Sequence, residues 1–122
     1  MLSKKFRLTK KQDFGRVSRT GKFFGEKFLA IKVVLNNLPV SRFAFIVSLK
    51  VSKKSTERNL VRRRMSECVR LKMPEIALGY DVVFFTRAEI VHKNYREIKQ
   101  AVMEVLRKAK LINVKCQSSN IK

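Results

Sequence analysis

Acidic residues, histidine and cysteine are scarce in this 122-residue chain, which carries nine Asp and Glu, one His and two Cys. No two acids are spaced as a general acid–base pair or a two-metal site, and no glycine-rich phosphate loop or nucleophile elbow occurs. Asp81 is the best single candidate for a catalytic acid, but a role in a turn or cap explains it more simply. Cys68 and Cys116 have no second Cys or His at ligand spacing, so neither a disulfide framework nor a zinc site is supported. We therefore predict no catalytic residue and no metal site in the protein.

Long apolar segments are also missing. No run approaches the roughly 18 apolar residues of a membrane span. The N-terminal Lys4, Lys5 and Arg7 are not followed by the apolar segment of a secretory signal. We therefore expect a cytoplasmic protein with no membrane partner.

The length suits one domain comprising residues 1–122. A hydrophobic fraction of 45% is ordinary for a folded protein. We expect the core to span about residues 6–111. A basic N-terminal arm (1–5) and a polar C-terminal tail (112–122) are predicted to be flexible.

Positive charge is what the chain has in excess. Lys and Arg number 29 against 9 Asp and Glu, which gives a formal net charge of +20 and a pI of about 10.8. A domain this basic repels itself and attracts polyanions, nucleic acid first and anionic membrane second. Phosphate contacts made by Lys and Arg supply affinity rather than sequence reading.

The most concentrated block of charge, residues 50–70, has the composition of a helix with one cationic face. At about 100° per residue, the apolar side chains gather on one side. The cationic face holds few acids, whereas a merely solvated face mixes charges of both signs. We therefore predict that a polyanion lies across it. The wheel assigns to the apolar side Val61, Met65, Cys68 and Val69, and to the cationic face Arg58, Asn59, Arg62, Arg63, Ser66 and Arg70.

A shorter helix is predicted from Lys10 to about Arg19. Thr9 and Gln12 have the spacing of a capping box, and Gly21 is a stop signal. The helix carries Phe14 among basic residues. Two interpretations remain open for this ring, a core position and a partly exposed platform on which a base could stack. Phe23 and Phe24 interleave with basic residues in the same way.

The remaining elements predict an α+β fold. Residues 28–35 and 42–51 have strand composition and look like an antiparallel pair, whereas 82–85 form the continuous apolar run of an interior strand. Asn94 and Glu97 cap a strongly amphipathic helix that continues to about Ala109. We predict a single sheet of about four strands with helices packed on it, in the order α-β-β-β-α-β-α.

The run Val51-Ser52-Lys53-Lys54 followed by Arg58-Asn59-Leu60-Val61-Arg62-Arg63 resembles the signature of the bacterial ribonuclease P protein component. Further segments resemble the same family: Phe6-Arg7-Leu8 with Asp13-Phe14, Gly79-Tyr80-Asp81-Val82-Val83 with Arg87, and the helix at 95–106. The resemblance covers about residues 6–111. In one departure, Leu60 stands where that family usually has a basic residue.

The resemblance implies a function that composition does not show. In that family the protein is the small subunit of an endoribonuclease whose RNA performs the catalysis. The holoenzyme removes the 5′ leader from precursor tRNA by magnesium-dependent hydrolysis, so the implied partners are ribonuclease P RNA and precursor tRNA. The family fold also implies a left-handed crossover between parallel strands, against the usual right-handed rule.

The resemblance also assigns roles to particular residues. Docking on the catalytic RNA falls on Arg58, Asn59, Arg62 and Arg63. Lys53, Lys54, Arg64 and Arg70 are added on charge and wheel position alone. Contact with the leader falls on Phe14, with Lys10 and Lys11 beside it.

Three other functions share some of these features. A ribosomal-protein-like binder of structured RNA would have the same charge and the same lack of catalytic residues. A DNA-binding regulator would need a compact helix-turn-helix around the arginine helix, and none is recognisable. An autonomous nuclease would need acids that are less scattered.

Overall fold

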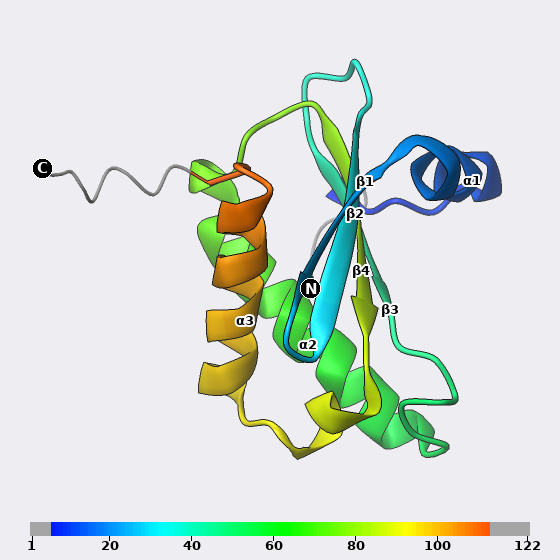
Figure 1. The fold of residues 1–122 in the computed structure, drawn as a ribbon, viewed down its shortest axis with the longest axis vertical. Helices are drawn as coiled ribbons and strands as arrows, with labels where there is room; N and C mark the ends of the chain where they lie inside the picture. Colours follow the sequence, from blue (N-terminus) through cyan, green and yellow to red (C-terminus); the bar gives the residue numbers. More distant parts are fainter. Residues whose placement is uncertain (1–5, 113–122) are drawn as a thin grey trace, which may run out of the picture.

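The computed structural model describes residues 6–112. A mixed four-stranded sheet of order β1-β2-β4-β3 stands between two helical layers, with α1 on one face and α2 and α3 on the other (Figure 1). This arrangement confirms the α+β class and the predicted order of elements. The elements are α1 (Lys11–Thr20), β1 (Lys22–Glu26), β2 (Leu29–Leu35), β3 (Arg42–Ile46), α2 (Ser55–Lys72), β4 (Tyr80–Thr86) and α3 (Tyr95–Lys108), with short 3₁₀ turns η2 (Met73–Glu75) and η3 (Ala88–His92).

The predicted antiparallel pairing of β2 with β3 is wrong. Strand β4 lies between them, antiparallel to β2 and parallel to β3. Its apolar run explains the central place, because Val82 and Phe84 are buried in the main core while Val83 is buried in a smaller cluster under α1. A strand with two buried faces belongs in the interior of a sheet. Strand β3 is therefore left at an edge, and α2 joins it to its parallel neighbour β4.

Strand β3 is also shorter than the predicted 42–51, because it ends at Ile46. The apolar residues that follow Ile46 in the predicted segment are only partly buried. Val47 and Val51 are buried, but Leu49 is 67% exposed in the turn that leads to α2. The strand composition therefore continues past the last strand residue into a turn, where only some of the apolar side chains are buried.

Helix boundaries follow local hydrogen bonds that the sequence patterns only partly foresee. The capping box at Asn94 and Glu97 is confirmed, with both reciprocal bonds present. The one predicted at Thr9 is wrong, because Lys10 occupies the N-cap of α1 without a side-chain bond. The N-cap of α2 is likewise a lysine, Lys54, which makes no side-chain cap bond. Gly21 does end α1, and a Cβ there would lie 2.4 Å from the Val17 carbonyl oxygen, so the close approach favours glycine.

The ends of the core differ slightly from expectation. Ile112, which was assigned to the tail, forms an isolated antiparallel bridge with Ile76. The predicted arm at 1–5 and the rest of the tail, with Cys116, lie outside the described residues. None of the helices in the described part of the chain is long and apolar enough to cross a membrane.

Asp81 holds α1 against the sheet. Its carboxylate is fully buried and accepts hydrogen bonds from Arg16 of α1, Arg42 of β3 and Asn36 of the β2–β3 loop. The Arg42 guanidinium makes two of these bonds, at 2.9 and 2.8 Å, and Asp81 is the main reason why the pKa of Arg42 is raised. Asp13 adds weaker contacts to both arginines, at 3.8 and 3.4 Å. The role expected for Asp81 in a turn or cap is therefore wrong, because this carboxylate links three elements.

The Asp81→Asn substitution tests this link. Removing the charge leaves two partly buried guanidinium groups without their main anion, so we expect a loss of about 3 kcal/mol in the free energy of unfolding, measured by urea denaturation. Asp13→Asn is the matched control, because its side chain is partly exposed, and it should cost less than about 1 kcal/mol. Equal losses in the two variants would contradict the assignment of Asp81 as the principal link.

Candidate nucleic-acid interface

A groove of about 230 Å³ runs along the open edge of β3, and we call it the edge groove. Its floor is β3, one wall is α1 and the other is α2. The chain segment before α1 enters along the same edge, where the Leu8 amide donates to the Phe43 carbonyl at 2.8 Å. Its lining residues are Arg7, Leu8, Thr9, Phe14, Phe43, Ala44, Phe45, Arg62 and Ser66.

Phe14 lies partly in the core and partly in the edge groove, so each of the two interpretations that the sequence left open applies to one side of the ring. The ring is half-buried and packs on the small cluster that includes Leu8, Val17 and Ala44. It also lines the edge groove. A ring with one side in the core is held rigidly, so its other side can offer a preformed surface to a base. Lys10 and Lys11 lie exposed beside it, at the start of α1.

On the opposite wall, Arg62 is oriented by two acceptors. One terminal nitrogen donates to Asn59 Oδ1 at 2.7 Å and the other to the Val47 carbonyl at 3.4 Å. Ser66, one turn further along, is 2% exposed and faces the same groove, so its assignment to the exposed cationic face was wrong. The structure thus brings Phe14 and Arg62, which belong to the two separately predicted sites, to one groove.

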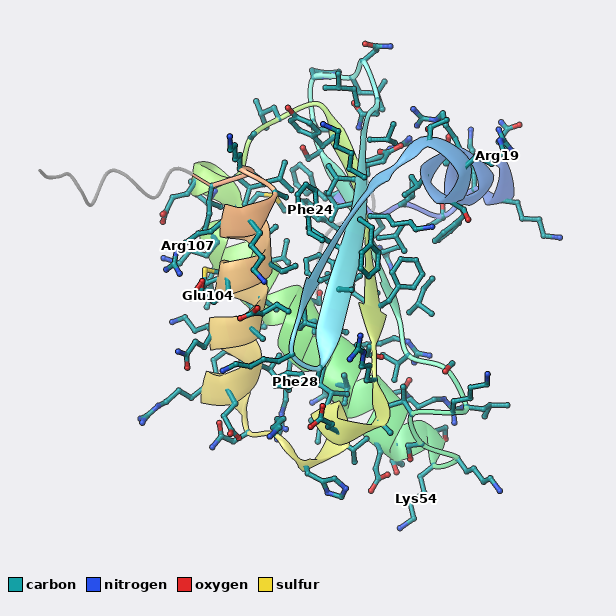
Figure 2. All side chains as sticks on the ribbon, viewed as in Figure 1. Arg19, Phe24, Phe28, Lys54, Glu104 and Arg107 are labelled. Atoms are coloured by element: carbon teal, nitrogen blue, oxygen red, sulfur yellow. The ribbon has the colours of Figure 1, made fainter. Side chains whose placement is uncertain are left out.

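The other predicted cations, which lie on α2 or just before it, fall into three groups. Arg58 and Arg64 are half-buried and donate to the carbonyls of Ser52 and Lys93, at 2.9 and 3.1 Å. Arg70 makes two bonds to Glu67, which lower the pKa of that carboxyl and offset the arginine's charge. No hydrogen bond or ion pair to another described residue holds the exposed side chains of Lys53, Lys54 and Arg63. Lys54 extends away from the fold at the start of α2 (Figure 2).

The buried side of α2 is as predicted. Val61, Met65, Cys68 and Val69 are each at most 2% exposed. Burial raises the pKa of the Cys68 thiol, which is the behaviour of a small core side chain rather than of a nucleophile.

Sequence reasoning did not separate Phe23 from Phe24. Adjacent strand residues point to opposite faces, and Phe23 is 60% exposed whereas Phe24 packs against the main core. Figure 2 shows the Phe24 side chain on the α3 side of the sheet. Phe23 pairs in register with Lys32, whose partner Val83 belongs to the α1-side cluster. The exposed ring therefore lies on the same face as α1, next to a lysine.

The groove residues of β3 were also missed as site residues. Phe43 and Phe45 belong to the predicted strand 42–51, and both contact the main core. Their position at an edge depends on the strand order, which the sequence does not carry. Within residues 6–112, no group of three or more His, Cys, Asp or Glu side chains could hold a metal ion.

Comparison with known proteins gives a consistent picture. A family model described as Ribonuclease P matches residues 2–110. The ribonuclease P protein component of Alkaliphilus metalliredigens is 39% identical over 107 residues, which cover 88% of this chain and 96% of the relative. That of Caldanaerobacter subterraneus is 35% identical over 115 residues, or 94% and 98% of the two chains.

Solved structures match the fold. The RNase P protein of Staphylococcus aureus has a TM-score of 0.82 at 23% identity and covers 88% of this chain and 98% of its own. The RNase P protein of Thermotoga maritima, solved in complex with 1-(4-fluorophenyl)-2-thiourea, has a TM-score of 0.78 at 24% identity, with 84% and 98% covered. The sheet order and the place of α2 are thus shared architecture.

Phe14→Ala tests the groove. Loss of a stacking ring should weaken binding of a single-stranded RNA oligonucleotide about fivefold or more, measured by fluorescence anisotropy. Because the ring is only half-buried, the loss in unfolding free energy should stay below about 3 kcal/mol. Val17→Ala, at the buried position one turn along α1, is the control and should cost stability without lowering the affinity of the folded protein. A Phe14→Ala protein with unchanged affinity would make the ring a core residue only.

Proposed function

Because this chain belongs to the bacterial ribonuclease P protein family, we propose that it binds the catalytic RNA of ribonuclease P together with the 5′ leader of precursor tRNA. The family makes it the protein component of an RNA–protein endoribonuclease. In this proposal the protein assists removal of the leader, while the RNA carries the catalysis. The supporting observation is the edge groove, where Phe14 and the arginine helix face one another across β3.

The two walls of the groove suit two different RNA surfaces. On α2, arginines present planar guanidinium groups, which bind phosphate oxygens in pairs and suit a structured RNA. On α1, Phe14 offers a stacking surface, and Lys10 and Lys11 offer cations that can follow a backbone. Stacking tolerates any base, which suits a leader whose sequence differs from one precursor to the next.

The positive charge of the protein explains how it would assist removal of the leader. Bringing a leader strand onto a folded RNA places two polyanions side by side, and lysine and arginine neutralise phosphates by displacing counterions. A net charge of +20 in a small protein supplies that neutralisation locally. The magnesium that the RNA-catalysed hydrolysis requires is then assigned to RNA phosphates, and the proposed roles of the protein's side chains are to hold and orient the strand.

Cleavage of a precursor tRNA by a bacterial ribonuclease P RNA at low magnesium, with and without this protein, tests the proposal. We expect a large gain in rate, with the leader released at the mature 5′ end. No gain, alongside equally tight binding to ribosomal RNA fragments, would favour the ribosomal-type binder. Cleavage by the protein without RNA would favour an autonomous nuclease instead.

The double variant Arg62→Ala with Arg63→Ala tests docking through α2. Binding to ribonuclease P RNA should weaken, and the slope of log affinity against log salt should fall by about 0.7 to 0.9 for each phosphate that is no longer neutralised. Arg70→Ala is the matched control, because its charge is already offset by Glu67, and it should change the slope less. A slope unchanged in the double variant would remove this helix from the RNA interface.

A further inference from the structure

A second hollow lies on the other flank of α2, where that helix meets the first turn of α3. It measures about 310 Å³ and is separate from the edge groove, with no lining residue in common. We call it the α2–α3 hollow. Its lining residues are Leu60, Arg63, Arg64, Glu67 and Tyr95.

The apolar part of this hollow is unusual for a cationic helix. Leu60 is 40% exposed although every neighbouring position that faces solvent is polar or charged. Tyr95, the first residue of α3, is half-buried beside it. A tyrosine ring is neutral at physiological pH, and burial and the neighbouring Cys68 thiol raise the pKa of Tyr95 further. An aliphatic side chain and a fixed neutral ring form a surface that a flat, uncharged group can contact.

The charged part of the hollow is positive and available. Arg63 makes no hydrogen bond or ion pair to another described residue, and Arg64 uses one nitrogen on the Lys93 carbonyl, a neutral acceptor. Neither guanidinium charge is therefore offset by a carboxylate of the described chain. The carboxylate of Glu67 is already engaged by Arg70 through bonds of 3.0 and 2.5 Å. An anion next to the apolar surface would thus meet two positive charges.

We propose that the α2–α3 hollow receives one unpaired base of the RNA docked on α2, with Leu60 and Tyr95 contacting the base and Arg63 its phosphate. This inference rests on the proposed function, because it concerns the RNA that α2 binds. A nucleotide is the occupant that matches these side chains, since it joins a flat apolar base to an anion over a distance that neighbouring side chains can span. A phosphate alone would leave Leu60 without a role.

The test compares stacking with charge on the same RNA. Leu60→Ala and Tyr95→Ala should each weaken binding to ribonuclease P RNA, the latter about fivefold or more. Neither should change the salt slope, because neither side chain neutralises a phosphate. Arg63→Ala should lower the slope by about 0.7 to 0.9. Tyr95→Phe, which keeps the ring, and Leu71→Ala, an exposed leucine on the same helix outside the hollow, should bind within about twofold of the parent protein.

A second readout does not depend on affinity. A single-stranded RNA with 2-aminopurine in place of one adenine should lose fluorescence on binding to the parent protein and to Tyr95→Phe, and lose much less with Tyr95→Ala. Thermal unfolding of each variant confirms that the folded protein is being compared. Quenching and affinity that are both unchanged in Leu60→Ala and Tyr95→Ala would overturn the proposal. Tighter binding with a steeper salt slope in Leu60→Arg would also overturn it, because the surface would then take a phosphate.

The failure of this inference is distinguishable from failure of the proposed function. If the protein stimulates cleavage of precursor tRNA while the Leu60 and Tyr95 variants bind normally, only the base-binding hollow is wrong. If the parent protein gives no stimulation, the proposed function is wrong, and 2-aminopurine quenching that still depends on Tyr95 would leave a base-binding hollow in a different RNA binder.

Discussion

The buried carboxylate of Asp81 is the constraint on which the geometry of this protein depends. It lies on the central strand β4 and receives Arg16 from α1 and Arg42 from the edge strand β3. These contacts join residues 65 and 39 positions apart in sequence. Without them, α1 would rest on the sheet through a small apolar cluster and a few other polar contacts, because only Val17 of that helix is fully buried. Phe14 lies close to Arg16 on the same helix, so the same ion pairs fix the wall of the edge groove.

Three arginines of α2 are held in a way that preserves their charge. Arg58, Arg62 and Arg64 each donate to a backbone carbonyl, from Ser52, Val47 and Lys93. A carbonyl orients a guanidinium group without cancelling its charge, whereas a carboxylate does both. Placing like charges close together on one helix costs a little stability. The preorganised donors gain in return when a polyanion binds, since less side-chain freedom is then given up.

The sequence predicted best those features that depend on neighbours along the chain. The apolar stripe of α3, its capping box at Asn94 and Glu97, and the interior character of β4 are local patterns, and the structure has them. Prediction failed where the answer depends on distant partners. We predicted that β2 pairs with β3 because the two strands are consecutive in the chain. Instead, β4 lies between them, because both of its faces are buried. Thr9 was predicted to cap α1, yet the backbone amide of its neighbour Leu8 donates to the Phe43 carbonyl at the edge of β3.

In the candidate site, too, local patterns were predicted correctly and features that depend on distant residues were not. The cationic face of α2 could be read from its composition, because charge repeats at helical spacing without any partner being known. Ser66 was wrongly placed on that face, since a helical wheel cannot show that this side chain is buried at the edge groove. Asp81 was assigned to a turn or cap, because Arg16 and Arg42 are distant in sequence and only the fold brings them to it. Phe14 needed the position of β3 before its two interpretations could be combined.

The helical spacing of α2 explains how one element can serve two RNA surfaces. Arg62 and Ser66 lie on the flank that lines the edge groove, and Leu60, Arg64 and Glu67 lie on the flank that lines the α2–α3 hollow. Asn59 is exposed on the ridge between them, and the exposed Arg63 stands where this ridge borders the hollow that it also lines. The two flanks are separated by the diameter of a helix, about 10 Å. An RNA docked across this ridge would have one edge at the hollow and the other at the groove. The rigidity of a single helix would then fix the position of a leader strand relative to the docked RNA.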